Sequence, residues 1–473
     1  MDPEAIDGDL SGAADLCVKV GLGVVPGEGR TLFARQAIEA GHHILREKPL
    51  RVAGSKEELA IALAEALGAD PEALTPALGS GASISGSSEP SHLAEAAVQT
   101  FGLEFLDGAN VCFFRVIGLV NHACATSEEA NCCLSVPFDA GSVAADELVA
   151  LLAVRRIAPG EPLRMPYVCP FAPHIQLEEL QRSHRFTCRC STCRVGGPAG
   201  PKTVACCAAC GSTGSTASPL KRCGGCKAVL YCSAACQQQH RPKHRRACGS
   251  TSLAPSSSEE ERAFLVAAEA EYDKVMAASD ESMAVASEAL SSRRRFDGES
   301  QLDESLSCMR GFLSQWVAGA SQLGAEPAAR VGGLRLAPGH PFVHYTRGNA
   351  VKQGLTRLAM RRTLLGKEPA GGCGALAAET QAHLQSCLAS AGAVLPRFHV
   401  ELLSLLRDAA DLRRLARDLL GLAADLEAYG RPDEGKVVGE ASLEAVDAWA
   451  AGLLAEHGDV LEAYGEPLGD VLE

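Results

Sequence analysis

The stretch that decides how this chain folds runs from Cys207 to Cys248 and reads CAACGSTGSTASPLKRCGGCKAVLYCSAACQQQHRPKHRRAC. Its seven cysteines and one histidine with metal-ligand spacing are Cys207, Cys210, Cys223, Cys226, Cys232, Cys236, His244 and Cys248. A C-x2-C pair brings two thiolates to one ion from a tight turn, and residues four apart share one face of a short helix. Eight ligands in this order make two tetrahedral sites, so we predict a small finger held by two structural zinc ions.

Cysteine usage in the rest of the chain supports the same interpretation. Twelve of the twenty cysteines lie between Cys169 and Cys248, and the N-terminal residues 1–9 are acidic, without the apolar core of a secretory signal. In a reducing compartment, clustered cysteines hold metal rather than disulfides. The longest apolar run, around 148–154, is far shorter than the about 20 residues of a membrane span. We therefore expect a cytoplasmic or nuclear protein without a membrane partner.

Length and charge limit the remaining function classes. The 473 residues predict about three domains, and 47% hydrophobic against 22% charged residues exclude a globally disordered chain. The net charge of −14 is uneven: residues 1–195 carry −10, residues 196–257 carry +8, and residues 258–473 carry −12. Because nucleic-acid binding needs many Lys and Arg contacts to phosphate, no direct nucleic-acid partner is expected. The basic island is the solvated surface of the finger, a contact for an acidic partner, or a charge that guides a basic substrate to another part of the protein.

Hydrophobic periodicity indicates an α+β multidomain protein. After a flexible N-terminus at 1–15, residues 16–194 mix short apolar runs with turn residues and predict a β-rich domain. Strands are expected at 18–25, 30–37, 44–52 and 148–157, and helices at 56–67 and 93–105. The finger occupies 205–248 and a linker 249–258. The remainder, 259–473, predicts an all-α region with helices at 261–278, 305–324, 350–365, 376–393, 398–422 and 442–461, of a length suited to TPR-like pairs.

The eight-ligand string resembles the MYND zinc finger, which is a protein-interaction module. The resemblance implies interleaved sites, with Cys207, Cys210, Cys232 and Cys236 on one ion and Cys223, Cys226, His244 and Cys248 on the other. Cys206 competes with Cys207 for the first position, but Cys207 has the better spacing. The family usually has Trp three residues before the histidine, and this chain has Arg241, which weakens the expectation of proline-rich peptide binding.

Three earlier motifs resemble those of SET-domain methyltransferases. PGEGRTLFA at 26–34 resembles a G-x-G-R-G-L strand and turn, VNHAC at 120–124 resembles N-H-S-C, and GEPLRMPY at 160–167 resembles G-E-E-L-x-x-x-Y. FTCRCSTC at 186–193 resembles the post-SET element F-x-C-x-C-x2-C. The chain therefore resembles the SET and MYND domain family, with residues 16–194 as the SET and post-SET domain and 53–115 as its insertion. The finger follows this domain, whereas in the family it lies inside it.

This resemblance implies an S-adenosylmethionine-dependent protein-lysine N-methyltransferase that acts on a histone or another protein. It implies that the cofactor contacts are Glu28, Gly29, Arg30, Asn121, His122, Tyr167 and Phe186, and that Tyr167 is also the catalytic residue. It implies a third zinc ion on Cys124, Cys188, Cys190 and Cys193, with Cys132 and Cys133 as the alternatives for the fourth ligand. Lysine-containing proteins are then substrates, and the finger and helical region would contact further protein partners.

The residue types suit this chemistry. Gly29 lets backbone approach a cofactor, Asn121 offers an amide, the His122 ring would cover the adenine, and Phe186 offers a stacking face. Asn110 is either a further cofactor contact or a turn asparagine.

Three departures from the family pattern bear on activity. Thr31 replaces a glycine and is expected to narrow the approach of the backbone to the cofactor. Pro166 removes a backbone N–H donor just before Tyr167, and Ala123 replaces a serine. The alternative function is therefore a catalytically weak or inactive SET and MYND adaptor that binds zinc and protein partners.

Overall fold

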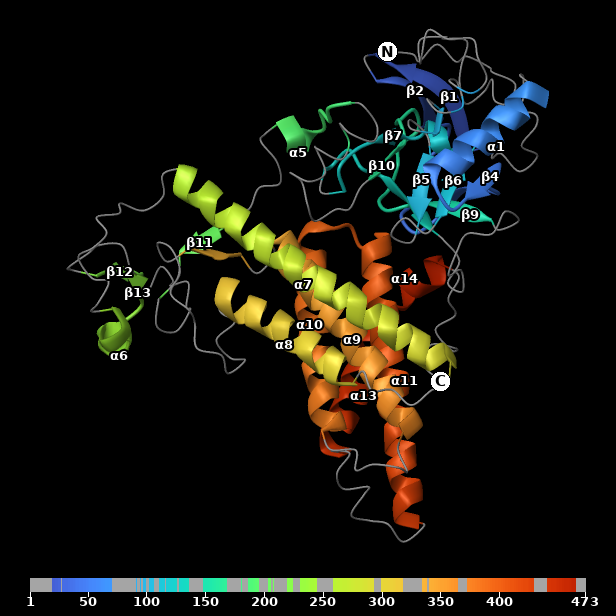
Figure 1. Cartoon of the computed structure of the whole chain (residues 1–473). Coiled ribbons are helices and arrows are strands. Elements are labelled where there is room, and N and C mark those ends of the chain that lie inside the picture. Colours follow the sequence, from blue (N-terminus) through green and yellow to red (C-terminus); the bar gives the residue numbers. More distant parts are fainter. Residues whose placement is uncertain are drawn as a thin grey trace. The chain divides into compact units, whose positions relative to one another are not determined.

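The computed structural model of the chain divides into two compact units (Figure 1). Unit 1 comprises Met1–Ala199, Gly392–Ser404 and His457–Glu473, and unit 2 comprises Gly200–Ala391 and Leu405–Glu456. The structure describes residues 19–26, 28–69, 91, 94, 97–98, 102–105, 110–114, 116–125, 127–135, 148–167, 180, 186–194, 203–205, 207, 219–223, 230–244, 258–292, 299–317, 334–337, 340–364, 372–428 and 440–464.

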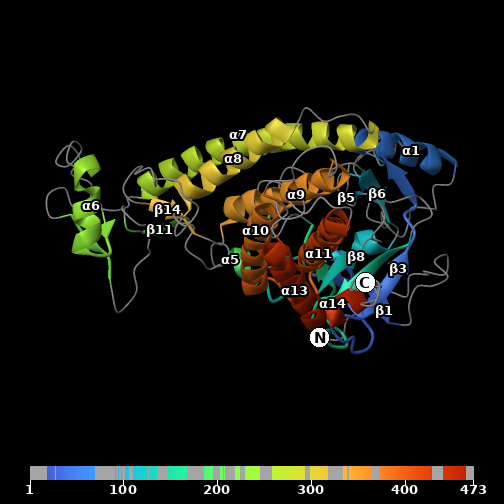
Figure 2. The ribbon, with the colours of Figure 1, turned by 90° about the horizontal axis from the view of Figure 1, so that it is seen from below.

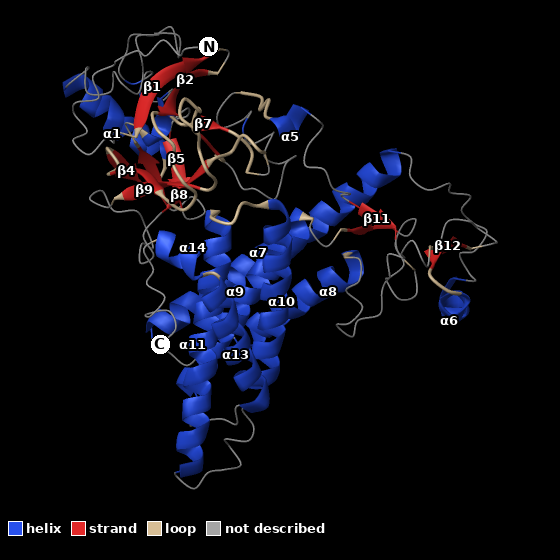
Figure 3. Cartoon of the chain, turned by 180° about the vertical axis from the view of Figure 1, so that it is seen from behind, coloured by secondary structure: helices blue, strands red, loops and turns tan. Residues whose placement is uncertain are grey.

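Unit 1 is built mainly of short strands (Figure 3). β1 (Val20–Val25) and β2 (Gly29–Ala34) form an antiparallel hairpin, and β7 (Asn121–His122) pairs in parallel with β10 (Arg164–Met165). One three-stranded antiparallel sheet has the order β3 (His43–Glu47), β9 (Val149–Ala153), β8 (Cys132–Ser135). Another has the order β4 (Arg51–Ala53), β6 (Asn110–Phe113), β5 (Gly102–Phe105). The remaining short elements are α1 (Lys56–Ala69), the 3-10 helix η1 (Ile117–Leu119) and α5 (Ser191–Arg194).

Among the buried clusters of unit 1, two pack its strands and its first helix. In the larger, Leu32 of β2, Ile44 of β3 and Leu151 of β9 are fully buried together. In the smaller, Leu59 and Leu63 of α1 pack against β6, because the four-residue spacing puts both on one helix face. The expected helix at 93–105 is wrong at its end, since Gly102–Phe105 is strand β5. There, antiparallel pairing with β6 prevails over the local helical pattern.

The far end of the chain contributes to unit 1. Tyr464, which follows α14 (Gly458–Ala463), donates its hydroxyl to the Phe398 carbonyl at 2.8 Å and lies 3.1 Å from the Cys133 Sγ of β8. The His43 Nε2 of β3 lies 2.9 Å from the Ala463 carbonyl oxygen. The sequence-based boundaries assign these late residues to the helical region, whereas the structure groups them with the β-rich unit, because these contacts are non-local.

Unit 2 confirms the helical C-terminal region predicted from periodicity. Its long helices are α7 (Ser258–Ser292), α8 (Glu299–Trp316), α9 (Pro341–Leu364), α10 (Cys373–Val394), α11 (Val400–Ala428) and α13 (Glu440–Glu456); α10 and α11 extend past the unit boundary. α7 and α8 run side by side (Figures 1 and 2). The Tyr272 and Phe342 rings stack at 4.6 Å in the shared core. None of the described helices combines the length and hydropathy of a membrane span.

The part of unit 2 that contains the predicted finger has short strands and one helix. β11 (Thr203–Ala205) pairs with β14 (Leu334–Leu336), and β12 (Lys221–Arg222) pairs with β13 (Leu230–Tyr231), both antiparallel. α6 (Ala234–His244) follows β13. Ser233 begins this helix by accepting the Cys236 N–H at 3.1 Å, as side chains at helix N-termini do.

Candidate functional site

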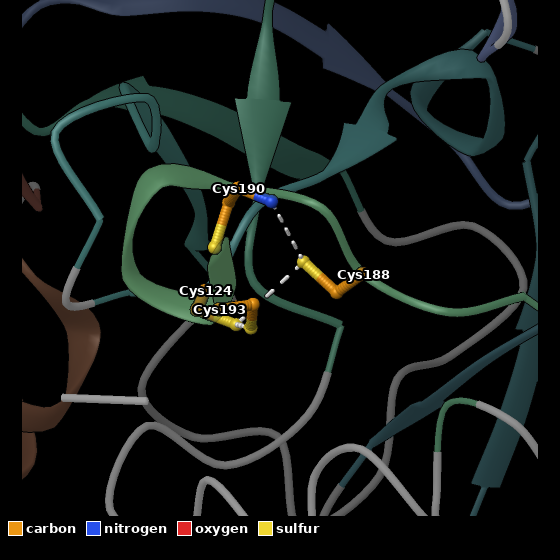
Figure 4. Close-up of side chains that lie close together, drawn as sticks. All are labelled: Cys124, Cys188, Cys190 and Cys193. Carbon is orange, nitrogen blue, oxygen red and sulfur yellow. Dashed lines mark hydrogen bonds between the residues drawn. The ribbon is translucent and has the colours of Figure 1, made fainter. Parts of the chain in front are cut away.

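Four cysteines from two distant segments meet in unit 1 (Figure 4). Cys124 follows β7, and Cys188, Cys190 and Cys193 belong to the segment around α5; all four sulfur atoms lie within 4.8 Å of one another. We call this group the four-cysteine centre. A tetrahedral zinc ion with bonds of about 2.3 Å spaces its sulfurs about 3.8 Å apart. The Cys124 Sγ lies 3.9 Å from that of Cys188 and 3.5 Å from that of Cys193, which fits such an ion.

Hydrogen bonds among the four cysteines and their burial shift the pKa values of their thiols. Hydrogen bonds with Cys188 and Cys190, together with burial, raise the pKa of Cys124 far above that of an ordinary thiol. Hydrogen bonds with Cys124 and Cys188 lower the pKa of Cys190, and burial raises that of Cys193 to about 12. One thiolate is therefore stabilised by neighbouring thiols that keep their protons. A soft divalent cation such as zinc can replace those protons, so the donor set fits zinc.

The two alternative ligands lie elsewhere. Cys132 and Cys133 are buried in β8, where the Cys132 thiol donates to the Arg164 carbonyl at 3.4 Å. Cys133 contacts Tyr464, and burial raises its pKa to about 11. Neither belongs to the four-cysteine centre among the residues that the structure describes.

Three rings lie beside this centre, and we call them the aromatic cluster: His122, Tyr167 and Phe186. The ring centroids of His122 lie 5.2 Å from Tyr167 and 5.7 Å from Phe186, and those of Tyr167 and Phe186 are 6.3 Å apart. The Tyr167 hydroxyl donates to the Val120 carbonyl at 2.5 Å. Burial raises the pKa of Tyr167, so its phenol stays protonated at neutral pH. The sequence motifs at 120–124, 160–167 and 186–193 therefore converge in space.

The Asn121 side chain has an unsatisfied donor. Its Nδ2 is buried and has no hydrogen-bond partner in the described part of the chain. Buried polar groups are nearly always paired, so an orphan of this kind indicates a missing ligand or water. Asn121 lies on β7, next to the aromatic cluster, and its position suits a cofactor contact.

The Thr31 side chain connects three segments of unit 1. Its side chain is completely buried, and its hydroxyl donates to the Leu163 carbonyl at 3.3 Å and accepts the Asn121 N–H at 3.3 Å. The hydroxyl thus fastens β2 to β7 and to the residue before β10. The structure therefore gives the Thr31 side chain a role inside the fold, and the expectation that it narrows the approach of the backbone to a cofactor stays a prediction.

The turn between β1 and β2 carries the other predicted cofactor residues. Gly29 has a φ of 89°, which favours glycine, and a Cβ built there would meet no atom within 4 Å. Arg30 is half-buried, and burial lowers its pKa. Glu28 is bound by the Arg164 guanidinium at 3.0 to 3.3 Å, and Arg164 stands opposite Asn121 in the β7–β10 register.

Sequence reasoning missed two residues that build this site, Arg164 and Asn131. Asn131 donates to the Glu161 Oε1 at 3.0 Å and to the Pro162 carbonyl at 2.9 Å, and accepts the Arg164 N–H at 2.9 Å. It therefore holds the segment that leads to β10. Arg164 lies in a quoted motif and Asn131 seven residues after another, but their partners are 30 to 136 positions away, so spacing could not identify them. For Asn110, only the backbone in β6 is described.

The finger shows part of its predicted ligand set. The sulfurs of Cys207, Cys232 and Cys236 lie within 4.8 Å of one another, and those of Cys232 and Cys236 are 3.5 Å apart. Cys223 is buried with Tyr231 in the adjoining apolar cluster. The remaining positions lie outside the described residues: Cys206, Cys210, Cys226, Cys248 and the side chain of His244.

One comparison with known proteins identifies the finger. Residues 207–248 match the zf-MYND family, described as the MYND finger, which confirms the finger predicted from spacing. A comparison with curated protein sequences found no match. The solved structure of the SET domain of LSMT bound to lysine and AdoHcy matches 37% of this chain and 54% of its own, with 12% identity and a TM-score of 0.25. The chain thus spans about half of that neighbour, and a TM-score of this size does not establish a shared fold.

Proposed function

We propose that the protein is an S-adenosylmethionine-dependent protein-lysine N-methyltransferase of the cytoplasm or nucleus, with its MYND finger as an interaction module. The observation that carries the proposal is the buried, unpartnered Asn121 amide. Asn121 precedes His122 of the aromatic cluster on β7, and it stands opposite Arg164, which binds Glu28 in the turn before Gly29. The two cysteine groups support zinc binding, and we propose three ions, two in the finger and one in the four-cysteine centre.

The residues of unit 1 suit the bound cofactor. When bound, S-adenosylmethionine supplies an electrophilic methyl group. Asn121 would donate its free N–H to the cofactor, and Gly29 leaves room for the backbone to approach it. Phe186 is half-buried and offers a face for adenine stacking. The Glu28–Arg164 pair brings both charge signs to the same turn.

Methyl transfer requires a neutral lysine amine, whose pKa in water is about 10.4. Burial beside rings favours the neutral amine, because desolvation penalises its charged form. Tyr167 would orient this amine through its protonated hydroxyl, which donates to the Val120 carbonyl. Holding two reactants in position provides much of the rate enhancement in such a displacement.

Isothermal titration of the zinc-loaded full-length protein with S-adenosylhomocysteine tests cofactor binding. We expect one site per chain, and Asn121→Ala should weaken the affinity about 10-fold, in keeping with one lost hydrogen bond to a buried ligand. Asn349→Ala in α9 is the control and should bind normally, since Asn349 lies in unit 2, where its amide bonds to the Tyr345 carbonyl and to Ser279 and Met276 of α7. Absence of binding by the wild type would reject the methyltransferase and leave the adaptor function.

Turnover tests the catalytic role. Tyr167→Phe keeps the ring in the aromatic cluster and deletes one hydroxyl, so cofactor affinity should be retained while turnover on a lysine peptide falls by about 10²-fold or more. Equal turnover by variant and wild type would reject the role of Tyr167. Normal binding of S-adenosylhomocysteine without any turnover on lysine peptides would favour the adaptor.

A further inference from the structure

We infer that His122 is a positioning residue that couples the four-cysteine centre to Tyr167. One ring nitrogen of His122 contacts the Cys124 sulfur, and the other contacts the Tyr167 backbone. The role of Tyr167 in this inference rests on the proposed function. The contact with the sulfur rests on the four-cysteine centre alone.

The hydrogen bonds determine which ring nitrogen carries the proton. The Tyr167 N–H points at His122 Nδ1 over 3.1 Å, and a backbone N–H can only donate. Nδ1 therefore accepts, and the neutral ring carries its proton on Nε2. Nε2 lies 3.5 Å from the Cys124 Sγ, so this N–H donates to the sulfur. One imidazole thus spans the two sites with a donor at one end and an acceptor at the other.

At the sulfur, this arrangement stabilises a metal-bound thiolate. A thiolate on zinc carries negative charge and accepts N–H donors, and such outer partners orient the ligand and affect the affinity for metal. Cys124 comes from the segment after β7, whereas the other three ligands come from residues 188–193. The His122 contact therefore acts on the ligand that joins the two segments.

At the tyrosine, the arrangement explains Pro166. β10 ends at Met165, and proline has no backbone N–H, so the Tyr167 N–H is the next donor along the chain after the strand. His122 accepts that donor and packs its ring edge-on against the Tyr167 ring at 5.2 Å. Backbone and ring of Tyr167 are thereby held by the same side chain. Loss of the imidazole should displace a hydroxyl that must be placed to a fraction of an ångström.

We call the two His122 contacts, to the Cys124 sulfur and to the Tyr167 N–H, the His122 bridge, and substitutions can remove each contact separately. In His122→Asn, the amide oxygen takes the place of Nδ1, and the shorter side chain no longer donates to the Cys124 sulfur. In His122→Gln, the amide nitrogen takes the place of Nε2 and the Tyr167 N–H loses its acceptor. His122→Ala removes both contacts. His340→Asn is the matched control, because His340 is buried in unit 2 and its Nδ1 likewise accepts a backbone N–H, that of Phe342 two residues along at 3.2 Å.

Three measurements on the full-length protein report the two His122 contacts. Zinc affinity by chelator competition and the sulfur-to-metal charge-transfer band of the Co²⁺-substituted protein report the sulfur contact. Hydrogen exchange of the amide of Tyr167 reports the backbone contact, without any need for activity. We expect His122→Asn and His122→Ala to lower the affinity for one zinc ion about 10- to 100-fold and to shift the charge-transfer band. His122→Gln should change neither. We expect Gln and Ala to accelerate Tyr167 exchange at least about 10-fold, while Asn and the His340 control do not.

Turnover then links the bridge to catalysis. Gln and Ala should lower kcat more than Asn does, because all three variants remove the ring that is predicted to cover the adenine, whereas only Gln and Ala release the Tyr167 backbone. The inference is overturned if His122→Ala leaves zinc affinity, the charge-transfer band and Tyr167 exchange within twofold of the wild type. Failure of the proposed function has a different signature, because S-adenosylhomocysteine would then not bind the wild type while the zinc and exchange results would still follow the His122 series.

Discussion

The buried Thr31 hydroxyl joins three segments of unit 1, and Thr31→Val removes it while keeping the branched shape of the side chain. The variant leaves no cavity, since valine and threonine have nearly the same volume. It deletes the bond to the Leu163 carbonyl and the bond from the Asn121 N–H, both at 3.3 Å. Both backbone groups would stay inside the fold without that partner.

The magnitude follows from these two bonds. Each hydrogen bond of this kind contributes about 0.5–1.5 kcal/mol net, and a buried group left unpaired costs about 1–3 kcal/mol. Both bonds are longer than the usual optimum, so we take the lower part of each range. Thr31→Val should therefore lower the free energy of unfolding of unit 1 by about 1–3 kcal/mol. With a urea dependence of about 2 kcal/mol per molar, the midpoint should fall by about 0.5–1.5 M.

The positions of the tryptophans allow the two units to be followed separately. Both tryptophans of the chain, Trp316 and Trp449, belong to unit 2, so their fluorescence reports that unit. Unit 1 can be followed by hydrogen exchange of peptides from β2 and β7. We expect Thr31→Val to shift the unit 1 transition and to leave the tryptophan transition unchanged. Because the Asn121 backbone moves with its side chain, affinity for S-adenosylhomocysteine should also fall.

A second buried threonine provides the control. Thr346 in α9 is completely buried, but its hydroxyl bonds only to the Phe342 carbonyl one turn earlier. Thr346→Val should cost less than Thr31→Val, because a helical carbonyl keeps its backbone bond. A cost below about 0.5 kcal/mol for Thr31→Val, or one no larger than that of the control, would refute the reasoning that this hydroxyl fastens β2 to β7.

Three further predictions concern metal, pH and the chain end. Cys124→Ser should lower the zinc content by about one ion and weaken S-adenosylhomocysteine binding, whereas Cys132→Ser should do neither; three retained ions in the first variant would place the fourth ligand elsewhere. Burial lowers the pKa of His399 to about 4 from 6.5, so stability of unit 1 is fully present above about pH 6.5 and should fall by about 2 kcal/mol by pH 5. Urea titrations of His399→Asn, which cannot titrate, should lack this dependence, and an equal dependence would assign it to another group. A chain that stops after Glu456 loses two completely buried side chains of α14, Val460 and Leu461, so unit 1 should lose about 3–6 kcal/mol in hydrogen-exchange measurements while tryptophan fluorescence is unchanged; equal exchange in both chains would contradict this.

Helices were predictable because their signal is local. The spacing of apolar residues at three and four positions predicts α7 to α11 and α13, and the structure has helices there. The ends differ where packing decides: α9 begins at Pro341, nine residues before the predicted start, and residues 102–105 are strand β5 rather than helix. Strand pairing is a long-range interaction, so a local pattern cannot report it.

The zinc finger and the helical second half were predictable from the amino-acid sequence, because ligand spacing and helical period are local patterns that extend over a few residues. The roles of the predicted site residues stay predictions, but their convergence is a property of the tertiary structure. Only the tertiary structure shows that the Thr31 hydroxyl joins β2 to β7, that Arg164 binds Glu28, and that Tyr464 contacts β8. The physical reason is distance along the chain: each of these contacts joins residues 90 to 331 positions apart, and only the folded core brings them within bonding range.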